Sequence, residues 1–129
     1  MKYGYTIVYV ADVRATLDFY GRAFGLETRF VTDDAQFGML QTGATALSFA
    51  HHDVARSSLA EGYRPLDADP LPAGIEIGLV TEDVPTAFAR AVEAGADAVT
   101  WPMQKPWGQT VAYVRAPEGT LVELCTPME

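Results

Sequence analysis

The sequence predicts an α+β protein made of two tandem modules, each with the element order βαβββ. Two observations lead to this class. Each half of the chain contains strand-like runs of β-branched and aromatic residues around one stretch with helical spacing, and the same order of elements occurs twice. A chain of 129 residues is also long enough to bury a core.

The first half opens with a predicted strand over residues 5–10, YTIVYV. Asp12 is a good N-cap for the helix-like stretch that follows, and Gly25 is a good stop signal. Turn signals then separate three further strand-like runs. These runs cover residues 27–32, 35–41 and 44–52.

The second half repeats this order. A predicted strand at residues 74–80 precedes Asp83, which opens a helix over residues 84–94 with a proline near its first turn. Gly95 ends that helix, and three further strands follow. They are expected over residues 97–102, 109–116 and 120–126.

Aligning the two halves gives the expected division of the chain. The helix starts align Asp12 with Asp83, and the glycine turns before the last strands align Leu47 with Glu123. We expect one domain over residues 1–129, with module 1 at about 1–52, a linker at about 53–74 and module 2 at about 75–129. The linker is either a plain connection or a loop that also covers a pocket.

Composition excludes several classes of function. Nine Lys and Arg against seventeen Asp and Glu give a net charge of −8, which disfavours nucleic acid and attracts cationic ligands weakly. Cys125 is the only cysteine, so an internal disulfide or a zinc site of several thiolates is excluded. We expect no signal peptide, because the residues before the first predicted strand lack its apolar region, and no apolar run approaches the roughly 18 residues of a membrane span. A cytoplasmic protein without membrane contacts is expected.

Three stretches resemble the vicinal oxygen chelate superfamily, which includes glyoxalase I, extradiol dioxygenases, and fosfomycin and bleomycin resistance proteins. VADVRATLDFYGRAFGL at residues 10–26 is similar to its first module. EDVPTAFARAVEAGA at residues 82–96 and KPWGQTVAYVRAPEGTLVEL at residues 105–124 are similar to its second module. The resemblance implies a glyoxalase-like fold in which each sheet forms half of a cup, and it implies a homodimer.

The resemblance also implies where a metal would bind. Metal-binding members place His on the first strand and Glu on the last strand of each module, and the matching positions here are Tyr5, Leu47, Glu76 and Glu123. The alignment of the two halves also gives Leu47. Because no His occupies these positions, we expect no metal cofactor. A divalent ion, if bound, would be held by Glu76 and Glu123.

Both glutamates stand between apolar neighbours in predicted strands, and strand alternation points both into the cup. Glu76 and Glu123 are therefore candidate general bases, because neighbouring carboxylates raise at least one pKa. The alternative is that they line a polar floor and contact a ligand.

Aromatic side chains complete the expected ligand site. Trp107 lies in a Pro-Trp-Gly loop that could present its ring to a ligand. His51 and His52 are adjacent at a strand end, so they point to opposite faces and cannot easily serve one ion. Cys125 is expected to be a core thiol. The predicted ligand-binding residues are Tyr5, Leu47, Phe49, Glu76, Trp107, Tyr113 and Glu123.

Two functions remain open at this point. The first is a metal-independent protein that sequesters a small organic ligand, an aromatic or cationic compound such as an antibiotic, with antibiotic resistance, catabolism and transport all open as the process it serves. The second is a metal-dependent lyase, isomerase or dioxygenase that uses Glu76 and Glu123 as metal ligands or general bases.

Overall fold

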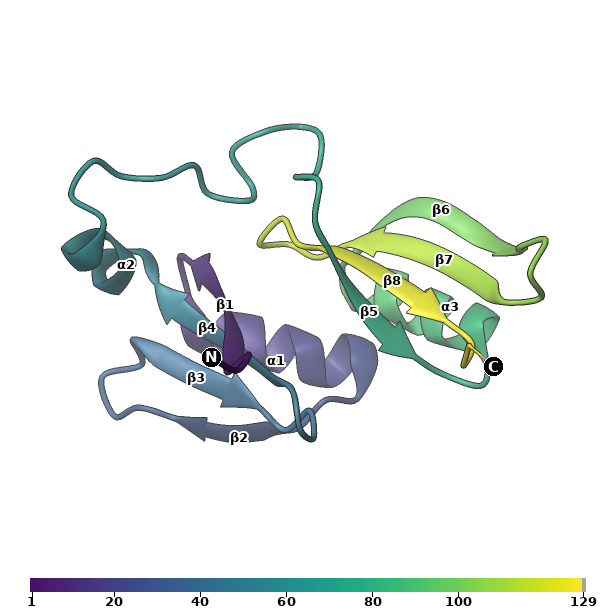
Figure 1. Ribbon diagram of the computed structural model, residues 1–129, viewed down its shortest axis with the longest axis horizontal. Coiled ribbons are helices and arrows are strands. Elements are labelled where there is room, and N and C mark those ends of the chain that lie inside the picture. The colour runs from purple at the N-terminus through teal and green to yellow at the C-terminus, as the bar shows by residue number, and fades with distance from the viewer. Residues whose placement is uncertain (129) are drawn as a thin grey trace. The chain divides into compact units, whose positions relative to one another are not determined.

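The computed structural model describes residues 1–128, which form two compact units. The boundary between them falls between Pro65 and Leu66, inside the predicted linker. Each unit contains a four-stranded mixed sheet with a helix packed on one face (Figure 1). The predicted α+β class with two βαβββ modules is confirmed. Within the described residues, no helix has the length and apolar character needed to cross a membrane.

The first unit has two helices and four strands. The strand order in its sheet is β1-β4-β3-β2, with β1 parallel to β4 and the other pairs antiparallel. The elements are β1 (Tyr5–Val10), α1 (Val13–Phe24), β2 (Thr28–Val31), β3 (Phe37–Leu40), β4 (Ala46–His51) and α2 (His52–Ser58).

Helix α1 begins and ends where the sequence predicts. The Asp12 carboxylate accepts a hydrogen bond from the backbone N–H of Ala15 at 3.0 Å, and Gly25 ends the helix in a left-handed conformation with φ of 71°. The buried side of the helix packs on β3 and β4, where the Tyr20 ring lies 4.9 Å from the ring of Phe49. This contact marks one face of the first sheet as the core.

Helix α2 was not predicted, because its residues were assigned to a strand end and a linker. The ring of His51 forms the N-cap and accepts a hydrogen bond from Asp53 N–H at 3.0 Å. Beyond the helix, the Tyr63 ring packs against Tyr9 with ring centres 4.9 Å apart and stacks on His52. Part of the expected linker is therefore an ordered piece of the first unit.

The second unit repeats the arrangement with one helix. Its strand order is β5-β8-β7-β6, with β5 parallel to β8 and the other pairs antiparallel. The elements are β5 (Glu76–Val80), α3 (Val84–Ala94), β6 (Asp97–Gln104), β7 (Thr110–Arg115) and β8 (Leu121–Cys125).

Helix α3 covers one face of the second sheet (Figure 1). Asp83 is its N-cap and accepts a hydrogen bond from Thr86 N–H at 3.1 Å, as the sequence predicts. The core lies between the helix and the sheet. Its buried side chains include Val84, Phe88 and Ala91 of α3 with Ala112, Val114, Val122 and Leu124 of the strands.

Arg115 fixes the segment that leads into the second sheet. Its guanidinium donates to four backbone carbonyls, those of Leu66, Asp69, Pro70 and Gly119, at 2.8 to 3.2 Å. Gly119, in the turn between β7 and β8, has φ of 99° and packs directly against the backbone of Leu66. The absence of a side chain at residue 119 makes this close approach possible.

Replacing Gly119 by Ala should lower the free energy of unfolding by about 2 kcal/mol or more. A Cβ atom would lie 2.4 Å from backbone atoms of Leu66, and the positive φ adds strain. Urea denaturation measures the change. Gly74→Ala is the control without a close contact or positive φ, and Gly43→Ala, with φ of 80° and open space around it, isolates the cost of φ alone. Equal losses at residues 119 and 43 would contradict the role of the Leu66 contact.

Candidate functional site

The open face of the second sheet, opposite α3, carries the acidic residues that the sequence singled out. Side chains alternate along each strand, so residues paired with Glu123 lie on its face. Its register partners are Gly78 on β5 and Tyr113 on β7. Glu76, two residues before Gly78, and Cys125, two residues after Glu123, share this face. The two glutamates therefore share one face of the second sheet.

Glu123 is held by a neighbouring phenol. The Tyr113 hydroxyl donates a hydrogen bond to Glu123 Oε2 at 2.8 Å, and both side chains are half-buried. On the other side, Gly78 leaves room beside the carboxylate, since a Cβ atom there would lie 3.8 Å from Glu123 Oε1. The Tyr113 hydroxyl is thus a fixed donor to the carboxylate, and no side chain stands at residue 78 beside its other oxygen.

The charge of Glu123 changes the titration of three neighbours. The hydrogen bond to Glu123, then burial, raise the pKa of Tyr113 to about 12. Burial, then a hydrogen bond to Glu123, raise the pKa of Cys125 to about 11. Partial burial, then repulsion from Glu123, raise the pKa of the more exposed Glu76 above its usual value. At neutral pH the phenol and the thiol are therefore protonated.

Arg115 lies on the same face, two residues from Tyr113, but its guanidinium is engaged by the four carbonyls described above. Arg115 therefore stabilises the backbone around it. Over the described range of residues 1–128 it forms no ion pair with Glu76 or Glu123, so the two carboxylates remain available to a ligand.

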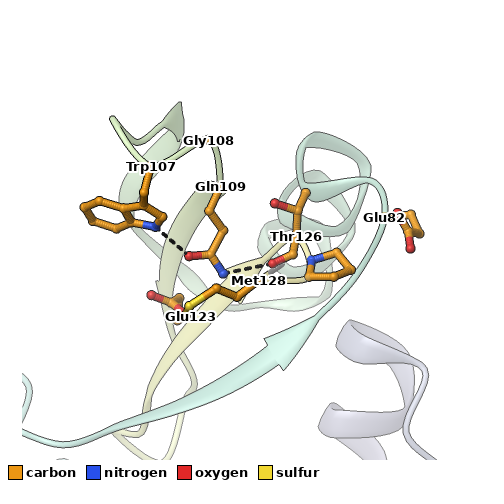
Figure 2. Close-up of a pocket in the computed structure, with 8 residues that line it drawn as sticks. Glu82, Trp107, Gly108, Gln109, Glu123, Thr126 and Met128 are labelled. Atoms are coloured by element: carbon orange, nitrogen blue, oxygen red, sulfur yellow. Dashed lines mark hydrogen bonds between the residues drawn. The ribbon is translucent and has the colours of Figure 1, made fainter.

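A pocket of about 730 Å³ opens beside Glu123 within the second unit (Figure 2). Its described lining includes two carboxylates, an indole and a methionine, and no Lys, Arg or His side chain. The lining residues are Glu82, Trp107, Gly108, Gln109, Glu123, Thr126, Pro127 and Met128. The predicted residues Glu123 and Trp107 thus share one cavity.

The two tryptophans have different surroundings although they are similarly exposed, at 64% for Trp107 and 66% for Trp101. The Trp107 indole lines the pocket, and its Nε1–H donates to Gln109 Oε1 at 2.9 Å. The Trp101 ring packs on Phe88 of α3, with ring centres 5.5 Å apart. Trp101 therefore belongs to the helix side of the sheet.

In the first unit, the residue equivalent to Glu123 is Ser48, and the prediction of Leu47 is wrong by one position. Tyr5 pairs with Ala46 and Ile7 with Ser48, just as Glu76 pairs with Leu121 and Gly78 with Glu123. The turn before β4 is one residue longer after its glycine than the turn before β8. A one-residue shift moves a side chain to the other face of a sheet.

Leu47 and Phe49 therefore lie on the helix side of the first sheet. Both are buried, and Phe49 packs on Tyr20, so neither side chain is presented on the open face. Tyr5 does lie on the open face and is 56% exposed. Ser48 is buried there, and its hydroxyl meets no hydrogen-bond partner among the residues that the structure describes.

The two histidines do not follow the strand alternation predicted from the sequence, because α2 begins at His52 and the two ring centres lie 6.4 Å apart. His51 caps α2, and Nδ1 of His52 forms a hydrogen bond with the Tyr63 hydroxyl. The Arg56 guanidinium also lies 5.8 Å from the centre of the Tyr63 ring. This cluster fastens the chain after α2 to the first unit.

The residues at the expected metal positions do not fit the donor set of the metal-binding relatives. With Ser48 in place of Leu47, these positions supply a phenol, a hydroxyl and two carboxylates, and no imidazole. First-row metals in catalytic sites are usually held by at least three good protein ligands, most often including His. In the described part of the chain, no three His, Cys, Asp or Glu side chains come together as a metal-binding group.

Sequence reasoning missed Gln109, Thr126, Met128 and Glu82 of the pocket lining. Gln109 follows the Pro-Trp-Gly turn directly. A polar residue at the base of this predicted hairpin was the one sequence signal for its place in the pocket lining. Thr126 is the last residue of a predicted strand and was not expected to line a pocket, and Met128 lies near the C-terminus, where sequence gives little indication of order.

Comparisons with known proteins agree with this architecture. The family model described as Glyoxalase/Bleomycin resistance protein/Dioxygenase superfamily matches residues 2–124. Among solved structures, a glyoxalase-related enzyme from Fulvimarina pelagi is similar, with 18% identity, a TM-score of 0.81, and coverage of 98% of this chain and 88% of that chain. A glyoxalase/bleomycin resistance protein/dioxygenase family enzyme from Burkholderia phytofirmans PsJN has 20% identity, a TM-score of 0.78, and coverage of 99% and 100%. A search of curated proteins found no match.

The raised pKa of Glu76 predicts how stability depends on pH. In the window from about 4.5 up to its folded pKa, the folded protein binds more protons than the unfolded chain. Stability should therefore fall as pH rises through this window, and Glu76→Gln should remove that part of the fall. Urea denaturation from pH 4.5 to 7 measures the effect, with Glu93→Gln on α3 as the matched control. Equal pH dependence in the wild type and Glu76→Gln would contradict the prediction.

Proposed function

The chain belongs to the glyoxalase/bleomycin resistance protein/dioxygenase superfamily, and we propose that it is a metal-independent protein that binds a small organic ligand. The ligand combines a cationic group with an aromatic or apolar part, as some antibiotics do. The observation that carries the proposal is the pocket beside Glu123, which joins carboxylates, an indole and a thioether and has no basic residue in its described lining.

The size and charge of the pocket support this ligand class. A volume of about 730 Å³ lies in the range of about 300–1,000 Å³ that is common for small-molecule sites. The net charge of −8 would also draw a cation toward the protein and repel an anion.

The position of Lys105 indicates where the cationic group would bind. Its ammonium lies 5.9 Å from the centre of the Trp107 ring, within the range of a cation–π contact. A ligand cation would compete with Lys105 for the indole, whereas Glu123 offers a carboxylate with no side chain at residue 78 beside it. We therefore place the cation at Glu123, close to Glu76, and the apolar part against Trp107 and Met128.

Metal independence is part of the proposal, and the mismatch of the donor set supports it. The homodimer that the family resemblance implies is also proposed, and light scattering on the purified protein would test it.

Ligand-observed NMR with three size-matched probes tests the proposed ligand class. At pH 7, benzylammonium should bind more tightly than neutral benzyl alcohol, and benzoate should bind least. Glu123→Gln should weaken benzylammonium binding about fivefold, which corresponds to about 1 kcal/mol for a partly exposed ion pair. Benzyl alcohol binding should change little.

Glu93→Gln is the control, because it removes the same charge from an exposed site on α3. Tightest binding of benzoate, or equal effects of the two substitutions, would refute the cationic ligand. Stoichiometric Mg²⁺ or Mn²⁺ in the purified protein, lost in both Glu76→Gln and Glu123→Gln, would instead favour the metal-dependent lyase, isomerase or dioxygenase.

A further inference from the structure

Trp107 lies in the five-residue connection between β6 and β7, residues 105–109, where a backbone hydrogen bond between Lys105 and Gln109 closes a tight turn around three residues. Lys105 N–H donates to the Gln109 carbonyl at 2.7 Å, and Gly108 N–H donates to the Lys105 carbonyl at 2.9 Å. Gly108 has φ of 98°, which a three-residue hairpin with a bulge requires, and Pro106 restricts φ at the preceding corner. The backbone of Trp107 is therefore held on both sides.

The Gln109 side chain holds the indole itself. It is only 9% exposed, and both ends of its amide are used. Oε1 accepts from Trp107 Nε1 at 2.9 Å, and Nε2 donates to the Thr126 carbonyl at 2.9 Å. Because the indole nitrogen can only donate and a carbonyl can only accept, this orientation of the amide is the one that satisfies both partners.

Thr126 is the first residue of the opposite pocket wall. Its N–H donates to the Thr110 carbonyl, and its Oγ1 accepts from Thr110 N–H, both at 3.0 Å. Pro127 and Met128 follow and line the pocket. Figure 2 shows the Gln109 amide between the indole and Thr126, so one buried side chain connects the two walls.

We infer that Gln109 is a positioning residue that fixes the Trp107 indole as the aromatic wall of the pocket and thereby sets a preference for ligands with an aromatic part. The role in ligand choice rests on the proposed function, whereas the immobilisation of the ring does not.

A purely structural role for Gln109 leads to different expectations. If the amide serves only to satisfy the Thr126 carbonyl, its loss lowers stability but changes neither the mobility of the indole nor the choice of ligand. If Gln109 positions Trp107, both of these properties change in a variant that remains folded.

The first measurement is the mobility of the Trp107 ring. Trp101→Phe leaves Trp107 as the one tryptophan, because the sequence contains two. In that background, Gln109→Leu, which removes both hydrogen bonds, should shorten the fluorescence anisotropy decay of the indole and increase acrylamide quenching at least twofold. Gln104→Leu is the matched control, because Gln104 is an exposed glutamine in the same hairpin.

The second measurement is ligand selectivity by NMR titration. The wild type should bind benzylammonium more tightly than butylammonium, and Gln109→Leu should reduce this ratio about threefold. The preference for benzylammonium over benzyl alcohol, which depends on Glu123, should persist. Trp107→Leu should lower the aromatic preference to the same extent, and combining it with Gln109→Leu should add little.

The outcomes separate the two proposals. Unchanged indole mobility and an unchanged benzylammonium-to-butylammonium ratio in folded Gln109→Leu would overturn the positioning role. If no ammonium probe binds the wild type, the proposed function fails, and the fluorescence measurement still decides whether Gln109 holds the ring. Should Gln109→Leu not fold, Gln109→Glu takes its place, because it keeps an acceptor for the indole and loses the donor to Thr126. Gln109→Glu should release Thr126 but leave the Trp107 ring less mobile than the ring is in Gln109→Ala. Equal mobility of the ring in these two variants would refute the inference.

Discussion

The hydrogen bond from Tyr113 to Glu123 determines how the open face of the second sheet carries charge. The Glu123 carboxylate lies on the face opposite the buried side chains of Val122 and Leu124, and its partial burial there would be costly if no donor met it. Tyr113 supplies that donor from the neighbouring strand, so Glu123 stays half-buried without a basic partner. The hydrogen bond to Glu123 is the main cause of the raised pKa of Tyr113, whereas burial, followed by the influence of Glu123, raises the pKa of Cys125 and of Glu76. An acidic site is thus built without an ion pair.

The two units share a strand register but differ in chemistry at equivalent positions. Tyr5 corresponds to Glu76, Ser48 to Glu123 and Met39 to Tyr113, because each pair has the same partners in its sheet. The first unit therefore presents a phenol, a thioether and a buried hydroxyl where the second presents two carboxylates and a phenol. The carboxylates at these equivalent positions thus belong to the second unit alone, and the repeat preserves geometry without preserving side-chain chemistry.

Local signals in the sequence were sufficient for the fold and for part of the site. Asp12 and Asp83 cap the two long helices as expected, because capping depends on residues close in sequence. The face of Glu123 also followed from strand alternation. Position 47 could not be placed this way, since the length of one turn determines which face it occupies, and a single residue reverses the answer. Helix α2 was missed because its cap is a histidine and its stretch is short.

The tryptophans show why exposure alone does not identify a binding residue. Trp101 and Trp107 expose nearly equal fractions of their surface, and both lie near prolines in the same hairpin. What differs is the way each ring is held. The ring of Trp101 rests on Phe88, an apolar contact that stabilises the helix side of the sheet. Trp107 has its polar edge fixed by a buried amide while much of the ring stays open to the pocket. A ring that is held in place but stays exposed contributes little to the stability of the fold. A ligand can bind such a ring without the further entropy loss of ordering it.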